Sequence, residues 1–326
     1  MTVDASGLSY CDGSGLGLLL EIRRRQEARG AAFELRGLAE QFRALLDLFG
    51  PAGVGAMPGP RRRGGLVEGA GRAAAGLLAD VREMVGFVGT LTFELCRLAL
   101  RPMSLRWKDA FWAAERAGVN ALPIVALIGF LIGLIMAFQA AMPMRKFGAE
   151  IYAADLVAIS TLRELGPLMT AIVLAGRSGS AFAAEIGTMK VNEEVNALTT
   201  MGLSPFRFLV LPRVVATVAM TPLLTVFTNL CGLIGGAVVL VIMGFPLVTY
   251  ANQVSGAVGM ADLLGGLAKA VVFGVLVAGA GCLKGLQTKT GASAVGESTT
   301  RAVVAGIVLI LVSDGVFSVV YYALGI

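Results

Sequence analysis

The sequence predicts an all-α polytopic membrane protein, in which interfacial amphipathic helices and five transmembrane helices follow a small cytoplasmic α/β domain. Two observations predict the membrane part. The chain of 326 residues is 56% hydrophobic with a mean hydropathy of +0.78, which is too apolar for an ordinary soluble protein. Several apolar stretches also reach the ~20 residues that a spanning helix needs. A third observation, alternating strand-like and helix-like patterns, is confined to the first 50 residues.

Residues 1–50 are predicted to form the small α/β domain. Strand patterns at residues 2–8 (TVDASGL) and 31–37 (AAFELRG) alternate with helix patterns at Ser14–Arg29 and Leu38–Phe49. A unit of this size rarely supports a core of its own, so we expect it to pack on a partner or to lack earlier strands.

Two segments join this domain to the membrane part. Residues 51–65 are rich in glycine and proline, which predicts a linker. Residues 66–118 mix apolar and charged side chains, which is typical of one or two amphipathic helices lying at the membrane surface. Trp107, Phe111 and Trp112 in this segment suit the lipid headgroup layer.

Five apolar stretches within residues 119–326 are expected to cross the membrane. The 43 glycines of the chain are typical of helices that pack closely in lipid. Basic residues gather in two loops but are absent between residues 244 and 268, so we place the N-terminus in the cytoplasm and the C-terminus in the periplasm. The predicted spans are residues 121–141, 155–185, 214–244, 263–283 and 302–324.

Four charged residues lie inside these apolar stretches: Arg163, Glu164, Lys269 and Asp314. A rise of ~1.5 Å per residue places all four in the outer half of the membrane. Neighbouring residues on a helix point about 100° apart, so Arg163 and Glu164 cannot neutralise each other. We expect the four charges to line one polar cavity suited to a zwitterionic or anionic amphiphile. The alternatives are structural ion pairs, or outward extension of Lys269 and Arg163 to the interface.

The loop between the second and third spans carries a second candidate site at residues 188–202. A short amphipathic helix is predicted there, ending at Gly202 with Ser204 and Pro205 beyond. Such a helix is a plausible docking surface for another protein, and the alternative is a solvated connector. The residues assigned to this helix are Glu193, Glu194, Ala197, Leu198 and Met201.

The composition argues against several other classes of function. The chain has no histidine, the commonest general base and metal ligand, and we expect no catalytic site, metal or cofactor. No segment matches a P-loop, so nucleotide-driven work is expected from a separate subunit. The net charge of +5 is dispersed along membrane flanks, which suits anionic lipid and not nucleic acid.

The run LRELGPLMTAIVLAGRSGSAFAAEIG at residues 162–187, continued by NALTTMGLSPFRFLVLPR at 196–213, resembles the MlaE family of lipid ABC-transporter permeases. The resemblance implies a homodimeric permease of the bacterial inner membrane. It also implies two partners, an ABC ATPase subunit and an MCE-domain lipid-binding protein, with phospholipid or a related lipid as cargo. The residues that it assigns to the lipid cavity are Arg163, Glu164, Lys269 and Asp314, and it assigns the ATPase contact to the loop helix.

Residues 1–50 resemble the C-terminal part of a STAS domain, through VDASGL, CDGSGLGLLLEIRRR and LRGLAEQFRALLDLFG. The first strands of the STAS pattern are missing, so we expect a partial domain. Gly13 stands where the pattern usually has a phosphorylatable serine or threonine, with Ser14 beside it. The resemblance implies a regulatory contact with the ATPase subunit.

Two other functions fit the same charges. A secondary transporter or ion channel would use them as a relay, and ion flux in liposomes without any ATPase would favour it. A membrane-anchored STAS scaffold would lose all function on deletion of residues 1–60, whereas a permease is expected to keep transport.

Overall fold

The computed structural model describes residues 2–8, 13–28, 30, 33–39, 66–101, 103 and 105–325. The chain divides into two compact units, Met1–Leu77 and Leu78–Ile326.

The N-terminal unit contains a parallel strand pair joined through a helix. Strand β1 (Thr2–Asp4) pairs with β2 (Glu34–Arg36), and helix α1 (Gly13–Ala28) lies between them in the chain. Parallel strands need such a crossover because a tight hairpin cannot join them. The predicted order of strand, helix and strand is confirmed.

A small apolar cluster accompanies this strand pair. Ala5 and Leu38 are buried against Leu35. The second predicted helix, Leu38–Phe49, lies outside the described residues from residue 40 on, as does the predicted linker 51–65. The described core of this unit is therefore small.

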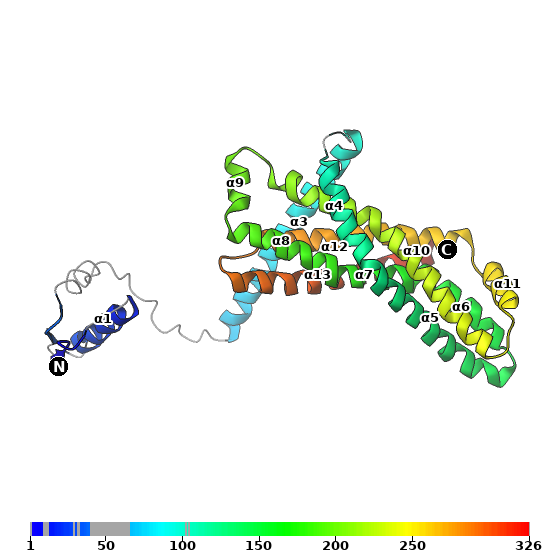
Figure 1. The fold of residues 1–326 in the computed structure, drawn as a ribbon, viewed down its shortest axis with the longest axis horizontal. Coiled ribbons are helices and arrows are strands. Elements are labelled where there is room, and N and C mark those ends of the chain that lie inside the picture. Colours follow the sequence, from blue (N-terminus) through cyan, green and yellow to red (C-terminus); the bar gives the residue numbers. More distant parts are fainter. Residues whose placement is uncertain are drawn as a thin grey trace. The chain divides into compact units, whose positions relative to one another are not determined.

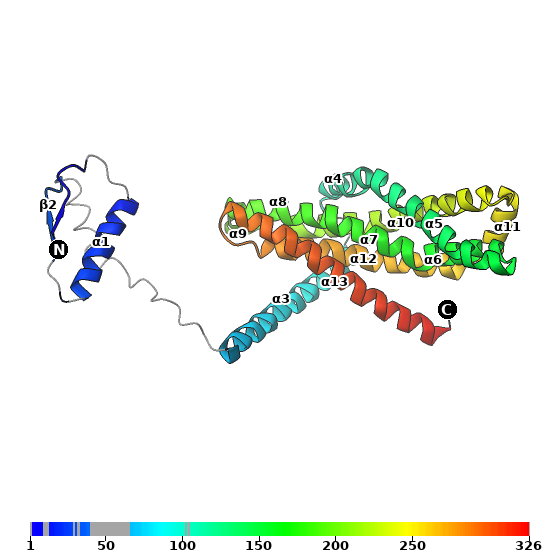
Figure 2. The same cartoon turned by 90° about the horizontal axis from the view of Figure 1, so that it is seen from below.

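The remaining elements are helices, and short turns join several of them into long rods (Figures 1 and 2). Five rods are long and apolar enough to cross a membrane, which confirms the five predicted spans. They are Trp107–Phe147, Glu150–Val191, Phe206–Ile242, Met260–Leu286 and Ser293–Leu324. The helices are α3 (Leu66–Leu100), α4 (Trp107–Gly118), α5 (Leu122–Met144), α6 (Ala153–Ser160), α7 (Gly166–Leu174), α8 (Ser180–Val191), α9 (Glu194–Thr200), α10 (Leu211–Ile242), α11 (Leu247–Ala257), α12 (Met260–Leu286) and α13 (Ala292–Leu324).

The structure differs from the predicted elements in two places. Helix α4, expected as part of the interfacial region, continues through a short turn at Val119–Ala121 into the first span. Gly118 and Pro123 flank this turn, and Pro123 lies in the first turn of α5, where a proline is tolerated. The outer loop after the third span contains α11, which was not predicted; Tyr250 anchors it by donating a hydrogen bond to the Leu233 carbonyl at 2.8 Å.

Glycines set the distance between α5 and α10, which lie side by side in both cartoon views. A Cβ added to Gly133 would lie 1.8 Å from the Gly232 carbonyl oxygen, and one on Gly235 would lie 2.1 Å from the Phe130 oxygen. Side chains at these positions would hold the two backbones apart, so the contact depends on glycine.

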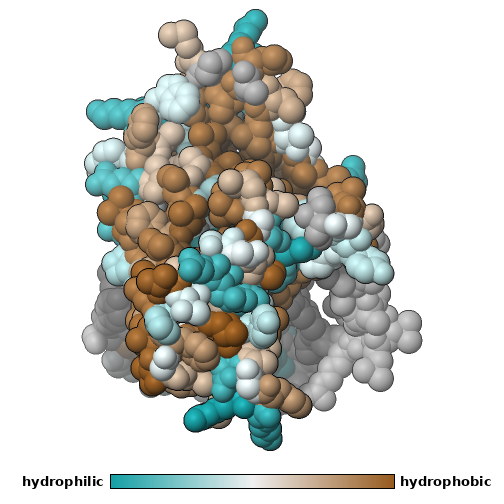
Figure 3. Space-filling view, turned by 90° about the vertical axis from the view of Figure 1, so that its right-hand side faces the viewer, coloured by the Kyte–Doolittle hydropathy of each residue, from teal (hydrophilic) through white to brown (hydrophobic). Residues whose placement is uncertain are grey.

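Apolar side chains also cover much of the outside of the membrane unit. On α5, Ile124, Leu127, Leu131 and Ile135 follow the helical spacing of one face, and all four are exposed. Figure 3 shows apolar side chains over much of the end that faces the viewer, and hydrophilic ones near its middle and along its edges. A surface of this kind fits lipid.

Candidate functional site

The second span changes its helical geometry at the charged dipeptide. A π-helical turn at Thr161–Leu165 separates α6 from α7 and carries both Arg163 and Glu164. Pro167, two residues after this turn, has no N–H to donate to the Arg163 carbonyl, which favours a wider turn at this point. Such turns are frequent at functional sites.

Glycine at position 166 allows α10 to approach this turn. A Cβ there would lie 1.7 Å from the Asn229 Oδ1 atom. The side chains of Asn229 and Thr161 are buried, and within the described part of the chain their polar side-chain atoms have no hydrogen-bond partner. The π-helical turn therefore lies in a polar part of the helix interface.

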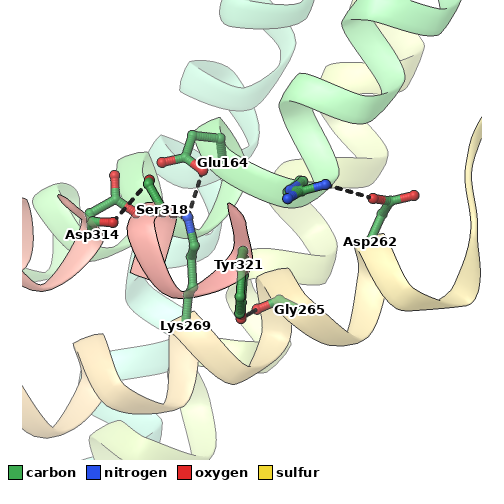
Figure 4. Close-up of polar contacts among 8 residues, drawn as sticks. Glu164, Asp262, Gly265, Lys269, Asp314, Ser318 and Tyr321 are labelled. Atoms are coloured by element: carbon green, nitrogen blue, oxygen red, sulfur yellow. Dashed lines mark hydrogen bonds and ion pairs between the residues drawn. The ribbon is translucent and has the colours of Figure 1, made fainter. Parts of the chain in front are cut away.

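Lys269 on α12 lies between two carboxylates from the neighbouring spans. Its Nζ is 2.5 Å from Glu164 Oε2 and 3.0 Å from Asp314 Oδ1 on α13 (Figure 4). The exposed fraction of the side chain is 0% for Lys269, 12% for Asp314 and 36% for Glu164. We call these three residues the ion cluster. Its contacts make a buried ammonium tolerable in a membrane, and they exclude outward extension of Lys269 to the interface.

Arg163 points away from the ion cluster. Its guanidinium lies 3.6 Å from Asp262 Oδ1 at the start of α12 and 5.8 Å from the Tyr321 ring. Lys269 Nζ lies 5.5 Å from the same ring, and the Tyr321 hydroxyl donates to the Gly265 carbonyl at 2.9 Å (Figure 4). The structure thus brings three of the four predicted residues together and places Arg163 in an adjoining ion pair.

Asp262 and Tyr321 were missed in the sequence, although a signal was available. Asp262 precedes Lys269 by seven residues and Tyr321 follows Asp314 by seven, which is about two helical turns. Each pair therefore lies on one face of its helix. A search of the faces that carry the known charges would have found both.

The second candidate site is the short helix α9 in the loop between the second and third rods. It begins after Glu193, whose φ of 62° is left-handed, and ends before Gly202, with a φ of 75°. A short helix before Gly202 was predicted, but it is shorter than residues 188–202, because α8 extends to Val191.

Helix α9 has one buried face, and most of the residues assigned to it from the sequence lie outside that face. Val195 and Leu198 pack against Leu209, whereas Ala197 and Met201 are exposed, together with the glutamates Glu193 and Glu194. Of the residues assigned to this site from the sequence, Leu198 is therefore the buried one, and Val195 shares its face. Two apolar side chains, Ala197 in α9 and Met201 directly after it, are therefore exposed beside two acidic ones.

Family comparisons match both parts of the chain. A family described as permease MlaE matches residues 111–320, and one described as a Mlab, STAS domain matches residues 1–57. The three residues of the ion cluster all lie within the first match.

Relatives of known description cover most of the membrane part. A probable ABC transporter permease protein of Rickettsia typhi is 38% identical over 198 residues, 60% of this chain and 76% of the relative. An intermembrane phospholipid transport system permease protein MlaE of Haemophilus influenzae is 34% identical over 210 residues, 64% of this chain and 80% of the relative. A chloroplastic protein of Arabidopsis thaliana, TRIGALACTOSYLDIACYLGLYCEROL 1, is 32% identical over 219 residues, 67% and 63% of the two chains.

Proposed function

Because the chain belongs to the MlaE permease family and carries a STAS domain at its N-terminus, we propose that its ion cluster contacts the lipid that the transporter moves. The protein is the multi-pass permease subunit of an ABC-type transporter for phospholipid or a related lipid. ATP hydrolysis is assigned to a separate subunit. Family membership favours this function over an ion relay or a signalling scaffold.

The burial of Lys269 between two carboxylates is the observation that carries the proposal. Lys269 on α12 and Asp314 on α13 are buried, while the side chains of Glu164 and Arg163 are about one-third exposed. These two residues offer opposite charges to a headgroup: the guanidinium suits a phosphate, and the carboxylate suits an amine or hydroxyl. Lys269 and Asp314 would then hold Glu164 in place.

The function is tested on the complex of this chain with its ATPase, purified in detergent and reconstituted in liposomes. Mass spectrometry of the extracted complex is expected to find bound phospholipid, and ATP is expected to drive lipid transfer between membranes. A chain that purifies alone and without lipid, and transfers none with the ATPase added, would contradict the proposal.

Glu164→Gln is expected to reduce lipid transfer at least tenfold, because the amide cannot supply the negative charge that faces the headgroup. The loss of one charge-assisted contact, ~1.5–3 kcal/mol, corresponds to roughly ten- to hundredfold. The fold should survive, since glutamine can still accept the bond from Lys269. Transfer in liposomes is the measurement, with Glu297→Gln on exposed surface as the control. Equal transfer by parent and Glu164→Gln would remove Glu164 from the site.

We also propose that α9 is the contact through which the ATPase acts on the permease. The helix lies in a loop that the basic residues assign to the cytoplasm, and Met201 is 65% exposed beside acidic side chains. An exposed apolar residue on a short, well-anchored helix fits a protein partner better than water.

Met201→Asp is therefore expected to lower co-purification of the ATPase several-fold and to uncouple ATP hydrolysis from transfer. The introduced charge would have to be desolvated in the contact. Met260→Asp is the matched control. Met260 is 71% exposed and begins α12, whose other end, at Leu286, packs against α9. If both variants bind the ATPase as the parent does, α9 is a solvated connector.

The assembly and orientation complete the proposal. We place two copies of the chain in the transporter, an MCE-domain lipid-binding protein on its periplasmic face, and the whole in the bacterial inner membrane with the N-terminus cytoplasmic. The STAS domain would contact the ATPase. Labelling of single cysteines introduced into α9 and α11 from each side of sealed vesicles tests the orientation, since only one of the two should react from outside.

A further inference from the structure

A cavity of about 530 Å³ opens between α4, α8 and α10, away from the ion cluster. Glu185, in its wall, follows Glu164 by 21 residues along one rod, which corresponds to about 30 Å at ~1.5 Å per residue. The cavity lies at the end of the rod that leads into α9. The cavity is therefore a different site from the ion cluster.

Arg116, Arg177 and Arg213, from three different segments, line this cavity. Two of them share one carboxylate, that of Glu185. Glu185 accepts from Arg116 at 3.0 Å and from Arg213 at 2.8 Å. The other acidic residue of the lining, Asp109, pairs with Arg106 at 3.0 Å, so it does not offset them. The lining therefore has an excess of positive charge.

Arg177 is the arginine best placed for an incoming anion. It lies in a π-helical turn, Ala175–Gly179, and its Nη1 donates to the Arg116 carbonyl at 3.4 Å. Among the ion pairs of the described residues, none involves Arg177, although its side chain is partly buried. A partly buried guanidinium without a carboxylate gains much from a phosphate, which matches its forked donors.

The rest of the lining is suited to an amphiphile. Trp112 lines the cavity, exposed and stacked beneath the Arg116 guanidinium at 4.8 Å. Apolar side chains, including Phe182 and Leu209, form other parts of the wall. Tryptophan beside arginine is typical of the headgroup level of a membrane, where an apolar ring and a phosphate ligand are both needed.

We propose that this cavity binds the phosphate of an anionic lipid headgroup, with Arg177 as its main contact and Trp112 against the glycerol region. The inference rests on the proposed function for the choice of a lipid as ligand. Inorganic phosphate shares the same chemistry, and the experiment separates the two sources.

Both tryptophans of the chain lie on α4, which gives a direct measurement. In a Trp107→Phe background, the fluorescence of Trp112 reports the cavity while dihexanoyl phosphatidylglycerol is titrated into the full chain in uncharged detergent. Arg177→Gln is expected to raise the Kd about tenfold, and Arg177→Lys to raise it less, since it keeps the charge but loses the fork. Arg301→Gln, on exposed surface near the same end, should leave the Kd unchanged.

Glu185→Gln is expected to change the Kd for the lipid in the opposite direction. Removing the one carboxylate shared by two arginines should lower the Kd for the lipid several-fold, a gain that misfolding cannot produce. An unchanged Kd in both Arg177→Gln and Glu185→Gln would overturn the proposal. Displacement of the lipid by inorganic phosphate at equal concentration would also overturn it, because free phosphate would then be the ligand. Lipid transfer by the complex is a separate measurement, so failure here leaves the test on Glu164 intact.

Discussion

Lys269→Met is expected to destabilise the folded chain by about 3–5 kcal/mol and to abolish lipid transfer. Removing one partner of a buried ion pair leaves an uncompensated charge in low dielectric, and here one ammonium serves two carboxylates, Glu164 and Asp314. Methionine fills a similar volume, so the effect reports charge and not a cavity. Thermal unfolding in detergent measures the stability, and transfer in liposomes measures the function.

A matched triple variant separates the structural and functional roles of the ion cluster. Lys269→Met combined with Glu164→Gln and Asp314→Asn removes every charge, and neutral replacements of buried ion networks are often tolerated. We expect stability to return towards that of the parent while lipid transfer stays lost. A single Lys269→Met variant as stable as the parent would show that the cluster is hydrated and contributes little.

Gly133→Ala is the second change with a large expected effect, about 3 kcal/mol of destabilisation. Its Cβ would lie 1.8 Å from the Gly232 carbonyl oxygen, an atom of the backbone that cannot rotate away. Relief requires that α5 and α10 separate, which loses contacts along their length. The midpoint of thermal unfolding is the measurement, and a larger loss is expected for Gly133→Leu.

Gly315→Ala is the control for Gly133→Ala. It lies within α13, where an added Cβ would meet nothing within 4 Å. Alanine forms a helix better than glycine, by roughly 0.8–1.0 kcal/mol in water-soluble hosts, so the control should be neutral or slightly more stable. Equal destabilisation at the two positions would mean that helix propensity, and not the α5–α10 contact, governs the result.

The sequence alone determined the number of membrane rods, the helix in the loop between the second and third, and the common level of Glu164, Lys269 and Asp314 along their rods. Each of these depends on local properties: hydropathy over a span, a glycine that ends a helix, and a constant rise per residue. Depth counting accordingly brought Lys269 and Asp314 to the level of Glu164, where the structure finds them in contact.

Only the tertiary structure decided which side chains at one depth face each other. That depends on the rotation of each helix about its axis, which neighbouring helices set through packing. The π-helical turn before Pro167 directs Glu164 to Lys269 and Arg163 to Asp262, and the packing of α9 buries Val195 while it exposes Met201. The level of a residue along its helix can be counted from the sequence, because each residue adds a constant rise. The direction in which its side chain points depends on the contacts between helices.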